Sequence, residues 1–194
     1  MPPAEKANAR RLVKDSLPLV ARGGGEVVVR VNNDPPLLAE DVDASVHPGL
    51  DCLSLPKAEA VDQLRELMVQ MDRLERARGI PPGHVKISKA FETPRGGLRA
   101  QELAEACPRV VTMGVGVEDY CLELGVEPSA DGIELLYAVS RVVTIAKALG
   151  IQPTGLMGSI AGFRDLPASR APPSAPASSA ARGRGAFTRI RSRC

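Results

Sequence analysis

Short apolar runs alternate with longer amphipathic segments along most of this chain, and this alternation constrains the fold more than any other feature. The runs are rich in β-branched residues and predict five strands, at 26–31, 52–55, 85–91, 109–113 and 151–159. The segments between them carry apolar side chains at helical spacing and predict helices at 4–21, 37–45, 58–79, 99–107 and 132–149. Strands that alternate with helices predict a parallel sheet, and Pro18 is expected to end the first helix early.

A closed barrel of β/α units and an open doubly wound sheet both fit this pattern. The barrel is favoured because polar side chains recur where the strands end, at Arg30, Lys57, Glu92 and Asp119. A complete barrel of this kind needs about eight strands. The visible strands therefore predict part of a barrel rather than a closed one.

The composition changes abruptly near residue 166, which divides the chain into a predicted domain at 1–166 and a tail at 167–194. The tail is rich in Pro, Ser, Ala and Arg and has no apolar periodicity, so it is predicted to be disordered. A frameshifted or artificially ended reading frame is the favoured explanation of the tail. An arginine-rich arm for nucleic acid or a membrane surface is the alternative.

The charge balance of the predicted domain argues against a nucleic-acid partner. The whole chain has 25 Lys and Arg against 23 Asp and Glu, but six of the arginines and none of the acids lie beyond residue 166. The 19 basic and 23 acidic residues that remain give positions 1–166 a net charge of about −4.

Membrane and secretory signals are also missing from the pattern. No apolar run approaches the roughly 18 residues that a membrane span needs, and the first residues lack the apolar core of a signal peptide. The four cysteines, Cys52, Cys107, Cys121 and Cys194, show no metal-binding spacing. Buried free thiols in a reducing cytoplasm are the expectation.

Glu92 and Asp119 are the strongest candidates for a functional site. Each follows an apolar strand, and the carboxyl ends of parallel strands meet on one rim of a barrel. Two carboxylates on that rim predict a site for Mg²⁺, which would keep water and substrate oxygens in its other positions. Taken singly, Glu92 could instead be a solvated or helix-capping acid, and Asp119 a helix N-cap.

Arg30 and Lys57 complete the set of polar residues at strand ends. The guanidinium of Arg30 can hold a carboxylate or carbonyl in a fork geometry, and a surface ion pair is an equally weighted alternative. Lys57 could contact an anion or act as a nucleophile, but a solvated lysine at a strand end is favoured. Arg30 is therefore the predicted catalytic and substrate-binding residue, with Glu92 as a second substrate contact.

Several short motifs in order resemble the citrate lyase beta-subunit-like group of the HpcH/HpaI aldolase family over residues 3–166. The motifs are Pro3-Ala4-Glu5-Lys6 with Ala9-Arg10, Val29-Arg30-Val31-Asn32, Leu55-Pro56-Lys57, Glu92-Thr93-Pro94-Arg95-Gly96, Gly116-Val117-Glu118-Asp119-Tyr120 and Leu136-Tyr137-Ala138-Val139-Ser140-Arg141.

The resemblance implies a (β/α)₈ TIM barrel of the phosphoenolpyruvate/pyruvate type, incomplete here, with about strands three to seven present. It implies a magnesium-dependent carbon–carbon lyase for an acyl-CoA or 2-oxo-acid substrate such as citryl-, malyl- or citramalyl-CoA. Glu92 and Asp119 would be the Mg²⁺ ligands, and Arg30 would hold the substrate. Family relatives also imply a homo-oligomer, either a trimer or a hexamer.

The same resemblance implies that an upstream acidic motif and the last barrel strand are missing. A catalytically inactive remnant or an assembly subunit of the same fold is therefore the alternative function. A third possibility is an enzyme that uses phosphoenolpyruvate or pyruvate. Some such enzymes need a phosphate-accepting histidine, and neither His47 nor His84 lies at a strand end.

Overall fold

The computed structural model describes residues 5–129 and 131–155, which form five strands and the helices around them. The strands are β1 (Val28–Arg30), β2 (Cys52–Leu55), β3 (Lys86–Phe91), β4 (Val110–Val115) and β5 (Gln152–Thr154). The helices are α1 (Lys6–Ala21), α2 (Pro35–Ser45), α3 (Val61–Ala77), α4 (Pro94–Leu98), α5 (Ala100–Glu105), α6 (Val117–Leu124), the 3₁₀ helix η2 (Ile133–Leu135) and α7 (Leu136–Ala148).

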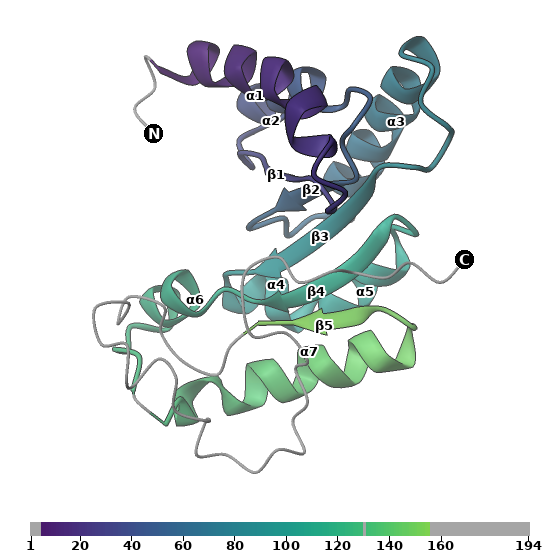
Figure 1. Ribbon diagram of the computed structural model, residues 1–194. Coiled ribbons are helices and arrows are strands. Elements are labelled where there is room, and N and C mark those ends of the chain that lie inside the picture. Colours follow the sequence, from purple (N-terminus) through teal and green to yellow (C-terminus); the bar gives the residue numbers. More distant parts are fainter. Residues whose placement is uncertain (1–4, 130, 156–194) are drawn as a thin grey trace.

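The five strands lie side by side in chain order, and every neighbouring pair is parallel (Figure 1). The helices follow the same order, since α2 contacts α3, α3 contacts α5 and α5 contacts α7. A doubly wound sheet reverses its strand order at a switch point, whereas a barrel winds in one direction. The order therefore has the winding of a (β/α) barrel over the described residues.

Apolar side chains on one face of the sheet form the core beneath the helices. Leu53, Leu55, Ile87, Phe91 and Met113 are essentially inaccessible to solvent. Because successive side chains of a strand point to opposite faces, the residues that alternate with these apolar ones lie on the other face of the sheet, which the described helices leave uncovered (Figure 1).

The helix-free face carries one polar residue from each strand in a single row. The hydrogen-bonding register pairs each member with the next, in the order Arg30, Ser54, Ser88, Thr112, Gln152. Within this row, hereafter the polar row, Thr112 Oγ1 donates a hydrogen bond to Ser88 Oγ at 2.7 Å. A polar row across all five strands makes this face suited to a polar ligand rather than to a second apolar layer.

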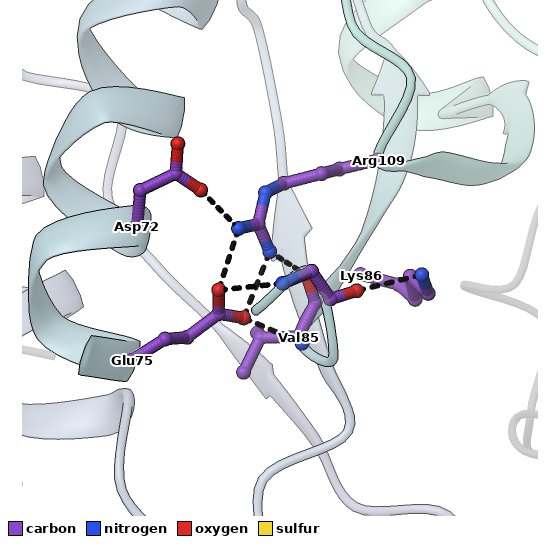
Figure 2. A network of polar contacts seen from close by, with 6 residues as sticks. Asp72, Glu75, Val85, Lys86 and Arg109 are labelled. Carbon is purple, nitrogen blue, oxygen red and sulfur yellow. Dashed lines mark hydrogen bonds and ion pairs between the residues drawn. The ribbon is translucent and has the colours of Figure 1, made fainter. Parts of the chain in front are cut away.

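A buried ion-pair network ties α3 to the amino-terminal ends of β3 and β4 (Figure 2). The Glu75 carboxylate is inaccessible to solvent and accepts hydrogen bonds from Arg109, from Val85 N at 2.9 Å and from Gly83 N at 2.9 Å. Arg109 also pairs with Asp72 and donates to the Val85 carbonyl oxygen at 2.7 Å. Polar contacts at this end of the strands serve stability, since active sites of such folds lie at the opposite end.

The structure corrects the prediction that Pro18 ends the first helix early, because α1 continues through Pro18 to Ala21. Pro18 is exposed, so the backbone carbonyl that loses its partner faces water, and the buried Leu17 anchors the same turn. Only some of the apolar side chains of α1 are buried. Leu12 and Leu19 are more than half exposed.

Two helices were absent from the sequence prediction. The segment after Glu92 forms α4 rather than a simple turn, and the glycine-spaced segment after β4 leads directly into α6. Glycines within α4 and directly before α6 disguised the helical spacing.

The expectation of buried thiols is confirmed for the part of the chain that the structure describes. Cys52, Cys107 and Cys121 are buried free thiols. No helix there combines the length and hydrophobicity needed to cross a membrane. The predicted tail at 167–194 and the end of the predicted strand at 151–159 lie outside the described residues.

Candidate functional site

Glu92 directly follows β3 and lies at the centre of the candidate site. Its side chain is 5% exposed, and Arg30 Nη2 donates a hydrogen bond to Oε1 at 3.2 Å. The second oxygen, Oε2, is buried without a hydrogen-bond partner in the described structure. Burial is the largest influence on the Glu92 carboxyl and raises its pKa, Arg30 lowers it, and the neighbouring Asp119 raises it.

The absence of a side chain at Gly116 leaves room for the side chain of Glu92. This glycine is the N-cap of α6, and its backbone N–H donates to the Phe91 carbonyl oxygen at 2.9 Å, which joins the ends of β3 and β4. A Cβ atom at this position would lie 2.5 Å from Glu92 Cγ. Any larger residue would therefore displace the carboxylate.

Asp119 lies in the first turn of α6, four residues beyond the end of β4. Lys57 Nζ, at the carboxyl end of β2, lies 3.5 Å from Asp119 Oδ2. Both side chains are about two-fifths exposed, with 41% for Lys57 and 39% for Asp119. The alternative roles as helix caps are not observed, because Gly116 is the N-cap of α6 and Thr93 is the N-cap of α4.

The backbone at Lys57 adopts an unusual conformation. Its φ of 47° makes it the one non-glycine residue with a positive φ in the described ranges 5–129 and 131–155. Its carbonyl oxygen accepts from Asn33 Nδ2 at 2.9 Å, and Asn33 in turn accepts from Gln63 Nε2 at 2.7 Å. Left-handed backbone at a residue with a Cβ is strained and occurs preferentially at functional sites.

Arg30 ends β1 on the polar row, where its side chain is 65% exposed. The segment after it is fixed by Asp41, whose Oδ2 accepts from the Asn32 backbone N–H at 2.8 Å. Arg10 Nε donates to Asp41 Oδ1 at 2.7 Å. The first helix thus holds the end of β1, and sequence reasoning gave Arg10 and Asp41 no role.

The segment that follows Glu92 packs against the start of α6. Thr93 Oγ1 caps α4 by accepting from Gly96 N at 3.1 Å, and a Cβ atom on Gly97 would lie 3.1 Å from the hydroxyl oxygen of Tyr120. Close packing between these two segments fixes Glu92 relative to Asp119.

Lys89 is a buried basic residue close to Glu92 that sequence reasoning missed. It is 3% exposed, its Nζ lies 4.8 Å from the centre of the Phe91 ring, and it donates to the Ala90 carbonyl oxygen at 2.6 Å. Burial lowers the pKa of Lys89 to about 7, against the opposing influence of Glu92 and Glu59. The signal was present in the sequence, because Lys89 interrupts the alternating apolar positions of β3.

The Glu92 and Asp119 carboxylates provide a donor set that suits Mg²⁺. No cluster of three or more His, Cys, Asp or Glu side chains is placed to hold a metal ion within residues 5–129 and 131–155. Mg²⁺ often takes only one or two protein carboxylates and keeps its other positions for water or substrate oxygens. The unpartnered Glu92 Oε2 is a buried acceptor that such a cation would satisfy.

These features define a class: a parallel α/β fold wound like a TIM barrel, with acidic and basic side chains gathered at the carboxyl ends of its strands. The family model for HpcH/HpaI aldolase/citrate lyase matches residues 2–161. The chain belongs to this family.

Relatives with known names agree with the family. The chain is 36% identical over 149 residues to the citrate lyase subunit beta of Leuconostoc mesenteroides subsp. cremoris, covering 76% of this chain and 49% of the relative. It is 30% identical over 168 residues to a (3S)-malyl-CoA thioesterase of Cereibacter sphaeroides (strain KD131 / KCTC 12085), covering 86% and 54%. The chain spans about half the length of the curated relatives it matches.

Solved structures show the same fold. The lead(II) complex of Haloferax volcanii malate synthase superimposes with a TM-score of 0.71 at 13% identity, over 87% of this chain and 53% of that one. RipC from Yersinia pestis superimposes with a TM-score of 0.60 at 24% identity, over 79% and 64%. The predicted family and the barrel-type α/β class are therefore confirmed.

Proposed function

We propose that this chain acts as a magnesium-dependent carbon–carbon lyase on an acyl-CoA or 2-oxo-acid substrate. Citryl-CoA, malyl-CoA and citramalyl-CoA are the candidate substrates, supported by relatives named citrate lyase subunit beta and (3S)-malyl-CoA thioesterase. The observation that carries the proposal is Glu92 Oε2, which is buried beside Asp119 and has no hydrogen-bond partner among residues 5–129 and 131–155.

In this proposal Glu92 and Asp119 hold the Mg²⁺ ion. When bound, Mg²⁺ supplies Lewis-acid stabilisation of the enolate that carbon–carbon cleavage produces. Gly116 keeps Glu92 in place, because any Cβ at that position would occupy the space of the Glu92 side chain. The barrier to cleavage falls because these charges are in position before the enolate forms.

Arg30 is the proposed substrate-binding and catalytic residue. Cleavage breaks the carbon–carbon bond beside a hydroxyl-bearing carbon. That carbon becomes a carbonyl as its hydroxyl proton passes to solvent water, and the electron pair of the broken bond remains on the acyl fragment as an enolate, whose carbon then takes up a proton. The exposed guanidinium of Arg30 can turn from Glu92 towards a substrate carboxylate or the enolate oxygen.

We also propose that the protein works as a homo-oligomer, a trimer or a hexamer, in the cytoplasm. Exposed apolar side chains on α4, α6, η2 and α7 support self-association, namely Leu98, Leu122, Ile133, Leu136 and Tyr137. The buried free thiols support a reducing compartment.

Enolate formation is the step to test. The 194-residue chain would be incubated with Mg²⁺ and acetyl-CoA or propionyl-CoA in deuterium oxide, and deuterium in the carbon next to the thioester measured by mass spectrometry. Citryl-CoA, malyl-CoA and citramalyl-CoA would be assayed in parallel for their carbonyl products. We expect exchange or cleavage that requires Mg²⁺ and is lost in Arg30→Gln. Mg²⁺ binding without exchange or cleavage would contradict the lyase and favour a non-catalytic subunit role.

A further inference from the structure

The ion pair between Lys57 and Asp119 places an internal cation on one of the two carboxylates that the proposed function assigns to Mg²⁺. Lys57 Nζ lies 3.5 Å from Asp119 Oδ2, longer than the roughly 2.7–2.9 Å of a close charge-assisted hydrogen bond. Both side chains remain accessible to water. At this distance, and with both side chains in contact with water, Lys57 and Asp119 can separate and each can pair with another ion.

The position of Lys57 is built into the backbone rather than left to a flexible loop. The strained φ of 47° persists because Asn33 holds the Lys57 carbonyl oxygen and Gln63 of α3 holds Asn33. The neighbours Pro56 and Ala58 are both buried, so the backbone on each side of Lys57 is fixed. An ordinary surface lysine needs no such support.

Each of the two candidate ligand carboxylates has a basic partner when no metal ion is bound. Arg30 pairs with Glu92, and Lys57 pairs with Asp119, so two basic groups face two acidic groups. A divalent cation that binds both carboxylates would place Lys57 beside a second positive charge. Like charges at this range repel, so Lys57 and the cation compete for Asp119.

We propose that Lys57 is a positioning residue that occupies Asp119 in the metal-free protein and is displaced when the divalent cation binds. This inference rests on the proposed function, since it takes Asp119 as a metal ligand. Displacement turns the ammonium away from Asp119 and frees it for a substrate anion. The same ion pair therefore limits metal affinity until an anionic substrate arrives.

The test measures Mn²⁺ binding to the 194-residue chain at low ionic strength, with electron paramagnetic resonance reporting the concentration of the free ion. Lys57→Asn removes the charge, and asparagine tolerates the left-handed backbone. We expect about two- to fivefold tighter Mn²⁺ binding, the range for an exposed ion pair, and we expect the gain to shrink as KCl is added. Lys57→Gly should bind as Lys57→Asn does, and Lys57→Arg as the unmodified chain does.

Arg95→Gln is the matched control, because Arg95 lies near the same strand ends but pairs with Glu59, at 3.9 Å. We expect its Mn²⁺ affinity to equal that of the unmodified chain. Equal tightening in Arg95→Gln, or unchanged or weaker binding in both Lys57→Asn and Lys57→Gly, would overturn the inference and leave the metal site standing. Failure of the unmodified chain to bind Mn²⁺ would overturn the metal site and this inference together.

Discussion

Single residues at the strand ends determine what this site can do. A buried carboxylate with only one hydrogen-bonded oxygen destabilises the folded state. In the described structure Glu92 has this arrangement, because Arg30 donates to Oε1 and Oε2 has no partner. The cost is tolerated when the group serves function rather than stability. Substitutions of these residues are therefore expected to change both the affinity for the metal ion and the stability of the fold.

Replacing Gly116 with alanine should damage the site while leaving α6 in place. The new Cβ would lie 2.5 Å from Glu92 Cγ, whereas the backbone φ of −87° suits alanine. We expect Mn²⁺ affinity to fall about tenfold to a hundredfold, as for other changes that misorient a ligand, with about 1–3 kcal/mol lost in stability. Gly25→Ala is the control, since a Cβ there meets nothing within 4 Å. Equal Mn²⁺ affinity in both variants would show that Gly116 has no positioning role.

Replacing Glu92 with glutamine should stabilise the metal-free protein at neutral pH. Burial raises the pKa of Glu92 in the folded state, so its ionised form weakens the fold at pH values above the ordinary value of 4.5. We expect Glu92→Gln to add about 1 kcal/mol at pH 7, and to add little at about pH 3.5, where both states are protonated. Thermal unfolding followed by circular dichroism at the two pH values measures this. A lower melting temperature at pH 7 would contradict the account.

At the scale of the elements, the two ends of the strands have different tasks. The carboxyl ends carry the candidate site, and the amino-terminal ends are joined to α3 by Glu75 and Arg109 (Figure 2). Burial is the largest single influence on the Glu75 carboxyl and by itself would raise the pKa. The hydrogen bonds from Arg109, Val85 and Gly83 outweigh burial, so the pKa lies below its ordinary value.

The lowered pKa of Glu75 predicts how the stability of this network depends on pH. Its contribution is present above the unfolded-state value of 4.5 and is lost as the pH falls through the lower folded-state pKa. Glu75→Gln removes the buried charge partner of Arg109 and leaves it only the half-exposed Asp72, so we expect a loss of about 3 kcal/mol at pH 7 and a smaller one in acid. Urea unfolding measures the difference. Asp62→Asn, which removes an exposed pair with Arg65, should change stability by less than about 1 kcal/mol, and an equal loss there would refute the role of Glu75.

Much of the element order was predictable from the sequence, and the reasons are local. The strand at Cys52–Leu55 was predicted with its observed bounds, because its apolar residues lie between the turn residues Pro48-Gly49 and Pro56. The starts of α4 and α6 were missed because glycines needed for tertiary contacts, Gly97 against Tyr120 and Gly116 against Glu92, weaken helical periodicity. A single sequence does not display contacts that form only after folding.

The candidate site was predictable to the same degree. Position at a strand end identified Arg30, Glu92 and Asp119, and the structure brings Arg30 to Glu92 and places Asp119 close enough to raise the Glu92 pKa. The pairing of Lys57 with Asp119 joins residues far apart in the chain, and the burial of Lys89 depends on the helix layer. Both depend on three-dimensional packing, which spacing alone does not encode.

At the scale of the whole molecule, strand order and helix order agree with a barrel that winds in one direction (Figure 1). Within the described residues, β1 pairs only with β2 and β5 only with β4, so the helix-free face with its polar row is part of an open sheet. The chain shares its family and its fold with known proteins, and metal binding is the proposed property that can be measured on this chain alone.

Mn²⁺ titration of the 194-residue chain, measured by electron paramagnetic resonance, tests most directly the central claim that Glu92 and Asp119 hold a divalent cation. The account predicts saturable binding of one ion per chain that Mg²⁺ displaces. Glu92→Gln and Asp119→Asn should each remove that binding, and Glu123→Gln, an exposed acid on the same helix as Asp119, should retain it. Binding that survives both Glu92→Gln and Asp119→Asn would contradict the assignment of these two carboxylates as the metal site.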